Sequence, residues 1–304
     1  MNGVLILDKP AGMTSFDVIR RLRKATGEKK IGHGGTLDPE VTGVLPVFFG
    51  NATKAADLLP ESGKEYEAEM ILGLTTDTED LTGTVLSESP VNVTEEEVRE
   101  AVLSFTGPYL QIPPMVSAKK VGGKKLVDLQ RKGVTVERKA EERSVERIEI
   151  RAIALPVIRF KASVSKGTYI RTLAADIGKK LGTGGTLKSL RRTRHGRFTE
   201  FDAIPLSEAE TLAAEGVLSE RLLPVEDLFP DFPKLSVKPE ADRFLKNGNR
   251  LIPGNFASYT DLSGSIPQDT FRIAFSTGEF CGLYRFDKES GEFVPVKMFL
   301  PEKG

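Results

Sequence analysis

Several residue types that commonly build functional sites are scarce in this 304-residue chain. It has a single cysteine, Cys281, which excludes an internal disulfide. Only His33 and His195 could join that cysteine, and these are too few residues for a conventional cysteine–histidine zinc site. A low cysteine count is typical of cytoplasmic proteins, so we expect a cytoplasmic location and no bound metal.

Long apolar runs are also missing. No stretch approaches the ~20 apolar residues that span a bilayer, so we expect no membrane segment. The N-terminal residues MNGVLILDKPAG contain a four-residue apolar run and no basic leader, which is not the pattern of a secretory signal. With 39% hydrophobic and 28% charged residues, the composition is that of an ordinary globular protein with one large domain or two modest ones.

Net charge is zero because 43 basic residues balance 43 acidic ones, and this alone argues weakly against a nucleic-acid partner. The distribution along the chain is uneven. Residues 119–139 carry eight Lys/Arg against two acids, residues 187–197 carry five against none, and residues 77–100 carry eight acids against one arginine. Two basic segments meeting on one face would form a positive surface for RNA. The alternative, that each segment is only a solvated face, remains open.

The first part of the chain is predicted to contain a short strand followed by a helix. Val4–Leu7 is predicted to form a short buried strand. Ser15 is expected to cap the helix that follows, whose apolar side would consist of Phe16, Ile19 and Leu22.

Further along, alternation over Lys64–Leu72 predicts a strand with Tyr66 on its apolar face. Thr94–Glu97 and Ser207–Glu210 have the spacing of capping boxes, and each predicts the start of a helix. Arg171–Leu181 is predicted to be helical and to stop at a glycine.

Composition changes at residues 229–239, where three prolines indicate a linker or a domain edge. Beyond it, residues 271–275, 280–286 and 293–299 are predicted as short strands, which favours a small β-barrel. Strands and helices mix without a regular βαβ alternation, so we expect an α+β fold.

Three segments contain candidate functional residues. Asp38 lies in a glycine-rich loop and could be a nucleophile, a general base or a turn residue, and its local spacing alone favours the turn. Tyr169 and Arg171 could face one cleft, where the arginine could bind a carboxylate through a bidentate fork and keep it ionised. Tyr66 could stack on an extruded base, an interaction worth ~1–3 kcal/mol in single-strand binders. Taken singly, a core tyrosine and a surface arginine are the commoner interpretations.

The segment GHGGTLDPEVTGVLP resembles the signature motif of the TruB family of tRNA pseudouridine synthases. Other segments agree with the family in the right order: GVLILDKPAGMTS, KEYEAEMILG, IPPMVSAKKVGGKKL, SKGTYIRTLAADIGKKLG and LKSLRR. The resemblance implies a catalytic domain over residues 1–232, with a mixed, mainly antiparallel sheet, flanking helices and a central RNA-binding cleft. It also implies a small PUA-like RNA-binding domain over residues 233–304.

The resemblance assigns the chemistry to residues of three motifs. Asp38 matches the catalytic aspartate, and Arg171 matches the arginine that pairs with it. Tyr66 matches the tyrosine that stacks on the target base, and Tyr169 lies beside Arg171 in its motif.

Four further residues have supporting matches. Leu190 matches an apolar residue of the uracil pocket, and His33 matches a histidine near the flipped nucleotide. Lys9 and Pro10 match an N-terminal pair that packs near the motif loop, whereas His195 has no match and is expected on the basic surface.

Three positions depart from the family pattern: Val116 and Val127 replace frequent tyrosines, and Val41 replaces a usual alanine. None of them removes a catalytic role.

The resemblance implies that uridine 55 in the T loop of tRNA becomes pseudouridine, after the base is brought out of its stack. Such a reaction needs no cofactor or metal. We expect a monomer that acts on the T arm without a guide RNA. A non-catalytic protein that binds or folds tRNA, and a guide-dependent synthase, are the alternatives.

Overall fold

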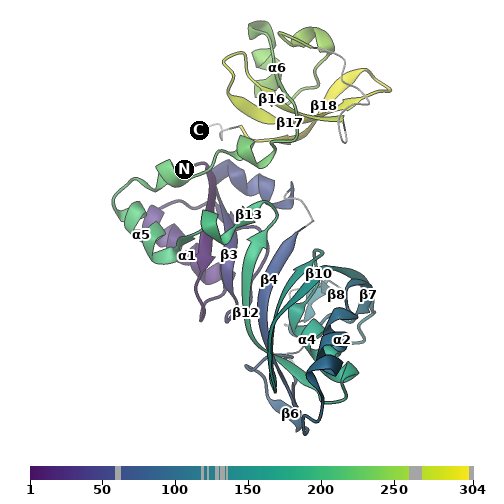
Figure 1. The fold of residues 1–304 in the computed structure, drawn as a ribbon. Coiled ribbons are helices and arrows are strands. Elements are labelled where there is room, and N and C mark those ends of the chain that lie inside the picture. The colour runs from purple at the N-terminus through teal and green to yellow at the C-terminus, as the bar shows by residue number, and fades with distance from the viewer. Residues whose placement is uncertain are drawn as a thin grey trace.

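A computed structural model describes residues 1–58, 63–117, 120–121, 123–126, 130, 134, 136–259 and 269–300. Its largest element is a ten-stranded sheet, drawn with its helices in Figure 1. The strands of this sheet are β1 (Gly3–Lys9), β2 (Ile31–His33), β3 (Thr42–Phe49), β4 (Lys64–Leu72), β7 (Gly107–Gln111), β10 (Glu141–Ala154), β11 (Val157–Val164), β12 (Gly185–His195), β13 (Phe198–Thr199) and β14 (Ile204–Pro205).

The order of the strands explains how distant segments become neighbours. It runs β14-β1-β3-β12-β4-β11-β10-β7, with β2 beside β3 and β13 beside β12. Among the described pairs of this sheet, β1 with β14 and β3 with β12 are parallel, and the others are antiparallel. The expected α+β fold with a mixed, mainly antiparallel sheet is therefore confirmed.

Helices cover the sheet in two groups (Figure 1). α1 (Ser15–Thr26) and α5 (Leu206–Ala214) pack together beside β1, and Arg21 of α1 forms an ion pair with Glu210 of α5. α2 (Glu95–Leu103) contacts β10, and α4 (Ile170–Lys180) lies against β12 and β4. Two helix groups thus flank the line along which β3, β12 and β4 meet.

The helix starts test the predicted caps. Thr94 caps α2 with a complete capping box, as predicted. At α1 the cap is Thr14, whose hydroxyl accepts a hydrogen bond from the N–H of Asp17, so the prediction for Ser15 is wrong. Ser207 lies inside α5, which has no side-chain cap, so the second predicted capping box is also wrong.

Burial confirms one predicted face and corrects another. The side chains at Tyr66, Ala68, Met70 and Leu72 are all buried on one face of β4, as the alternation predicts. Phe16 was expected on the apolar side of α1 but is 60% exposed, because the helix turns Val18, Ile19 and Leu22 toward the core instead.

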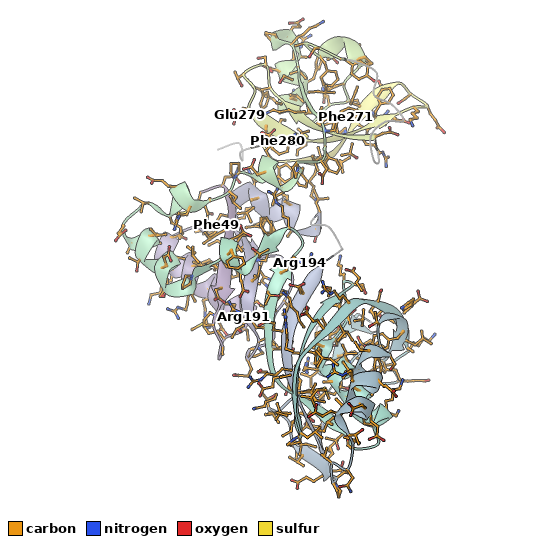
Figure 2. The ribbon with its side chains drawn as sticks, viewed as in Figure 1. Phe49, Arg191, Arg194, Phe271, Glu279 and Phe280 are labelled. Carbon is orange, nitrogen blue, oxygen red and sulfur yellow. The ribbon has the colours of Figure 1, made fainter. Side chains whose placement is uncertain are left out.

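A smaller sheet in the order β15-β16-β17-β18 forms the C-terminal part. Its strands are β15 (Lys234–Ser236), β16 (Thr270–Ala274), β17 (Phe280–Asp287) and β18 (Glu292–Met298), with the short helix α6 (Asp242–Lys246) beside them. Phe280 lies on the side of this sheet nearest the large one, whereas Phe271 belongs to its separate core (Figure 2).

The segment at residues 229–239, predicted as a linker or a domain edge, is not an exposed tether. Phe229 is buried, with ring centroids 6.1 Å from Phe232 and 6.2 Å from Phe299. β15 within the same segment pairs with β16. The prolines therefore mark a packed connection, in which the aromatic side chains offset the cost of ordering the backbone.

Candidate active site

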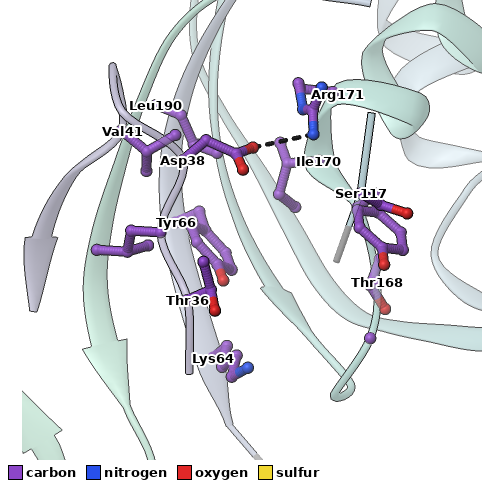
Figure 3. A pocket seen from close by; sticks show the side chains of 13 residues that line it. Thr36, Asp38, Val41, Lys64, Tyr66, Ser117, Thr168, Ile170, Arg171 and Leu190 are labelled. Carbon is purple, nitrogen blue, oxygen red and sulfur yellow. Dashed lines mark ion pairs between the residues drawn. The ribbon is translucent and has the colours of Figure 1, made fainter. Parts of the chain in front are cut away.

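A pocket opens between the loop that joins β2 to β3 and the start of α4 (Figure 3). Its volume is about 190 Å³, and an apolar cavity of roughly 150 Å³ already accepts a benzene ring. The pocket therefore has room for a single aromatic ring. Five segments of the chain line it: Thr36, Leu37, Asp38 and Val41; Lys64 and Tyr66; Ser117; Gly167, Thr168, Tyr169, Ile170 and Arg171; and Leu190.

Asp38 stands on a loop that α1 holds from behind. The Ser15 hydroxyl accepts a hydrogen bond from the N–H of Leu37 at 2.9 Å and donates to the Leu37 carbonyl at 3.2 Å. The N–H of Val41 donates to the Asp38 carbonyl at 3.1 Å and closes a turn. The Ser15 side chain thus holds the backbone of the residue beside Asp38 and does not cap the helix.

Lys9 fixes the other side of the same loop. Its buried ammonium donates to the carbonyl of Pro39 at 2.9 Å and to the carbonyls of Pro10 and Met13 at 2.7 and 2.6 Å. Burial lowers the pKa of Lys9 to about 8, against the opposing effect of nearby acids. The Lys9 and Pro10 pair therefore packs near the motif loop, as the resemblance implies, although neither residue lines the pocket.

A close approach of two strands completes the support of the loop. Gly43 has a φ of 105°, and a β-carbon there would lie 2.2 Å from the carbonyl oxygen of Arg192 on β12. Only glycine allows this contact without strain. The buried Arg192 side chain then reaches under the loop, where Nε donates to the Val44 carbonyl at 2.8 Å and Nη2 to the Gly35 carbonyl at 3.1 Å.

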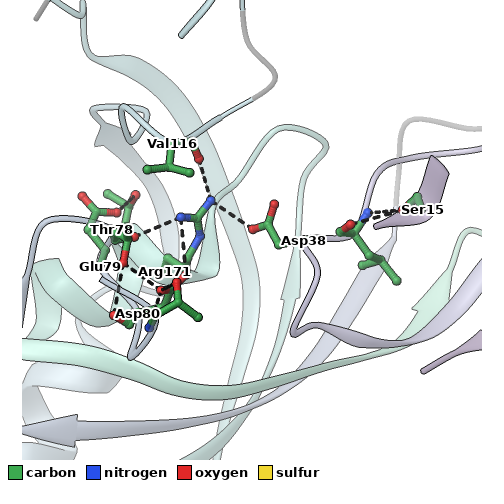
Figure 4. A network of polar contacts seen from close by, with 10 residues as sticks. Ser15, Asp38, Thr78, Glu79, Asp80, Val116 and Arg171 are labelled. Atoms are coloured by element: carbon green, nitrogen blue, oxygen red, sulfur yellow. Dashed lines mark hydrogen bonds and ion pairs between the residues drawn. The ribbon is translucent and has the colours of Figure 1, made fainter. Parts of the chain in front are cut away.

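Arg171 is the counter-ion of Asp38 (Figure 4). Its Nη2 lies 3.0 Å from Oδ2 of Asp38 and donates to the Val116 carbonyl at 2.7 Å. Its Nη1 donates to the Thr78 carbonyl at 2.9 Å and lies 3.6 Å from the Asp80 carboxylate. The arginine side chain is 5% exposed and the Asp38 side chain 46%. A buried guanidinium with both terminal nitrogens engaged therefore orients a carboxylate that is open to a ligand.

That arrangement differs from the expected bidentate fork. The ion pair joins one nitrogen of Arg171 to one oxygen of Asp38, because both terminal nitrogens also bind backbone carbonyls. It also explains why Val116 is acceptable where a tyrosine is frequent, since the residue contributes its carbonyl to this network. Val127, the second departure, lies outside the described residues.

The aromatic and apolar walls come from three elements. Tyr66 on β4 is buried and stands opposite Arg192 of β12, and Leu190 on β12 stands opposite Ala68 of β4. Tyr169 directly precedes α4, where its backbone N–H and carbonyl bond to the side chain of Gln111 at 2.8 and 3.0 Å. Tyr66, Tyr169 and Leu190 therefore all reach the pocket that contains Asp38.

The two histidines lie elsewhere. His33 is on β2 and does not line the pocket, and burial together with the charge of Arg192 lowers its pKa. His195 was expected on the basic surface, but it is buried at the end of β12. Burial and the charges of Arg192, Lys64 and Lys166 lower the pKa of His195 to about 2, so it is neutral.

The basic segment at residues 187–197 is only partly a positive surface. Lys188 forms an ion pair with a glutamate of β4, Arg191 binds the Asp8 carboxylate through two 2.9 Å bonds, and Arg192 is buried. The surface prediction is wrong for Arg192, whereas Lys188 and Arg191 lie at the surface with their charges paired to acids. Figure 2 shows Arg191 and Arg194 on β12. The other basic segment, residues 119–139, falls largely outside the described residues.

One charged pocket residue was missed by the sequence reasoning. Lys64 lies two positions before Tyr66, so the alternation that places Tyr66 on one face of β4 places Lys64 there too. That spacing was a usable signal. The sequence gives no comparable signal for three other pocket residues, which reach the pocket only through the tertiary fold: Thr36, Ser117 and Thr168.

No cluster of three or more potential metal ligands occurs in the described part of the chain. Within that same part, every helix is too short or too polar to cross a membrane.

Two solved structures resemble this chain over nearly all of its length. A chain of the H/ACA RNP bound to a substrate RNA containing 2′-deoxyuridine is 27% identical, with a TM-score of 0.71 over 99% of this chain and 86% of that one. A chain of a Cbf5-Nop10-Gar1 complex is 29% identical, with a TM-score of 0.71 over 98% of this chain and 85% of that one. The fold is that of the pseudouridine synthases.

Sequence comparison narrows the class. The description TruB family pseudouridylate synthase, N-terminal domain, matches residues 23–170, and tRNA pseudouridylate synthase B C-terminal domain matches residues 171–229. The tRNA pseudouridine synthase B of Lachnoclostridium phytofermentans is 45% identical over 99% of this chain and all of its own length. The tRNA pseudouridine synthase B of Bacillus pumilus is 44% identical over 100% of this chain and 99% of its own length. The chain belongs to the TruB family of pseudouridylate synthases.

Proposed function

We propose that this chain converts uridine 55 in the T loop of tRNA to pseudouridine, without a guide RNA and with Asp38 as the catalytic carboxylate. The observation that carries the proposal is the 3.0 Å contact between Asp38 and buried Arg171, at a ring-sized pocket that also contains Tyr66. The curated relatives named tRNA pseudouridine synthase B support tRNA as the substrate.

The target base has to leave its stack to enter such a pocket. A loop nucleotide is extruded at lower cost than a helical one, and loops are where proteins read RNA bases. Tyr66 would stack on the extruded uracil, and Leu190 would pack against it from β12.

The reaction breaks the bond between C1′ and N1 of uridine and forms a bond between C1′ and C5. The C5 hydrogen leaves as a proton and N1 gains one, so no redox partner is needed. Asp38 would attack covalently or stabilise positive charge at the ribose, and both roles require an ionised carboxylate beside the base. Arg171 favours that ionised form, because a buried cation 3.0 Å away stabilises negative charge.

The rest of the chain would bind the tRNA. We assign catalysis to residues 1–232 and RNA contact to the small C-terminal sheet within residues 233–304. The protein would act as a monomer in the cytoplasm.

Tritium release from [5-³H]uridine-labelled tRNA tests the proposal. The purified chain should release tritium from an unmodified tRNA transcript in the absence of any other RNA or protein. A transcript with cytidine in place of uridine 55 is the matched control and should lose the target-specific release. Release that persists with the cytidine transcript would overturn the position assigned here.

The same assay separates the alternatives. A protein that only binds or folds tRNA would bind the transcript without releasing tritium, which the Asp38–Arg171 pair argues against. A guide-dependent synthase would stay inactive until a guide RNA was added.

A further inference from the structure

Two cationic side chains converge beside Gly35, at the opposite end of the pocket from Arg171. Gly35 has a φ of 83°, and a β-carbon built on it would lie 3.5 Å from Nη1 of Arg192 and 3.5 Å from Nζ of Lys64. Both nitrogens therefore lie close to one point. Lys64 lines the pocket itself, whereas Arg192 is buried behind it.

Among the residues that the structure describes, neither cation has an acidic partner. None of the ion pairs formed within the described ranges includes Lys64 or Arg192. The nearest acid along the strand, Glu65, points to the other face of β4 and pairs with Lys161 at 2.7 Å. Nη1 of Arg192 is buried and has no hydrogen-bond partner in the described part of the chain.

Carrying these charges destabilises the free protein. Burial, together with the positive charges of Arg192 and Lys166, lowers the pKa of Lys64 to about 8. Burial also lowers the pKa of Arg192. Buried charges are normally paired, because unpaired ones lose their hydration without compensation. An anion held beside Gly35 would supply the missing opposite charge.

We propose that Lys64 binds a backbone phosphate of the RNA, at the nucleotide in the pocket or its immediate neighbour, with Arg192 as a buried charge behind it. The inference rests on the proposed function, since it assumes that RNA occupies the pocket.

The position of Lys64 suits a phosphate. Lys64 and Tyr66 occupy alternate positions on the same face of β4, which spaces their backbones about 7 Å apart. In Figure 3, Lys64 lies beyond Tyr66 as seen from Asp38. A base stacked on Tyr66 with its ribose near Asp38 can therefore direct its backbone toward Lys64. A lysine ammonium is a compact point charge that binds phosphate without a planar partner.

The test measures binding of a T-arm RNA hairpin as a function of salt, in an Asp38→Asn background that prevents turnover. Lys64→Met should weaken binding roughly tenfold and reduce the salt slope by about one. Lys64→Arg should preserve most of the slope. Lys24→Met, which removes an exposed lysine of α1, is the charge-matched control and should leave both unchanged.

A second arm identifies the phosphate. A neutral methylphosphonate is placed singly at each linkage around the target uridine. At one linkage it should weaken binding by the parent protein but have little further effect on Lys64→Met. Equal effects on both proteins at every linkage would overturn the proposal, as would an unchanged salt slope.

Two controls separate a lost phosphate contact from misfolding and from failure of the proposed function. Lys64→Met should unfold at a higher temperature than the parent, because it removes an unpaired, partly buried charge, so weak binding would not be due to misfolding. If the parent chain converts uridine 55 but Lys64→Met binds normally, the phosphate proposal alone fails. If the parent neither binds nor converts the tRNA, the proposed function fails.

Discussion

The two ends of the pocket differ in how their charges are balanced. At the carboxylate end, defined by Asp38 and Arg171, the buried guanidinium has two carbonyls and two acids around it. At the cationic end, defined by Lys64 and Arg192, two positive groups approach one point and no described acid pairs with them. The carboxylate end is therefore organised before RNA arrives, whereas the cationic end is completed by a ligand. Catalytic groups benefit from such preorganisation, and binding groups from differential contact with the ligand.

The most severe test of this contrast is Asp38→Asn. Asparagine keeps the size of the side chain but removes its negative charge, so isomerisation should fall by about 10⁴-fold or more. Binding of the tRNA should stay within a few-fold, because Asp38 contributes no attraction to phosphates. Tritium release and a filter-binding assay measure the two quantities. Normal tritium release by the variant would contradict the assignment of Asp38.

Arg171→Lys tests the organisation of the carboxylate end. A lysine cannot contact the Thr78 and Val116 carbonyls and the Asp38 carboxylate in the same geometry, so two buried carbonyls lose their donors. We expect kcat to fall by roughly 10²-fold, an effect comparable to removing one preorganised donor from an active site. Single-turnover kinetics at saturating tRNA isolate this step. An unchanged rate would mean that Arg171 is only a structural residue.

A smaller effect on kcat is expected from Ser15→Ala, and a substitution at the neighbouring Thr14 is the control. Ser15→Ala removes both bonds to the backbone of Leu37, so the Asp38 loop should shift and kcat should fall by about tenfold. Thr14→Ala removes the α1 cap and should cost ~1 kcal/mol of stability with little effect on kcat. Thermal unfolding and single-turnover rates should separate the two variants. Equal losses of kcat would contradict the positioning role of Ser15.

The smallest expected effect is on the pH dependence of unfolding. Burial lowers the pKa of Lys64 to about 8 in the folded protein, from its ordinary value of 10.5. Between these two values the unfolded chain holds a proton that the folded chain has lost, so this residue makes stability rise with pH. The destabilising effect of the buried Lys64 charge is fully present below pH 8. In Lys64→Met, the free energy of unfolding should rise less steeply with pH than in the parent. The difference in slope should correspond to at most about one bound proton. Denaturant titrations between pH 8 and 10 measure it, and parallel curves would contradict the buried charge.

Local patterns predicted the elements whose determinants are local. Alternation identified β4, and Thr94 with Glu97 identified the start of α2, because both features depend on residues a few positions apart. Ser15 was mistaken for a cap because its partner, Leu37, is 22 residues away. A charge count similarly placed Arg192 on the surface, although the β3–β12 contact buries it.

The candidate site was predictable only in part for the same reason. Nothing near Asp38 distinguishes it from a turn residue, since Arg171, its counter-ion, comes from α4, much later in the chain. The ordered family motifs supplied that long-range information. Lys64 shows the opposite case, because its position on the Tyr66 face of β4 was readable from the alternation alone.

The place of β12 in the large sheet has a consequence for synthesis of the protein. β12 lies between β3 and β4, although both are translated long before it. A nascent chain that ends before residue 185 contains Asp38 and Tyr66, but lacks the strand that joins them and supplies Arg192 and Leu190. The pocket can therefore assemble only late in translation, and truncated products should be unable to hold RNA in a catalytic arrangement.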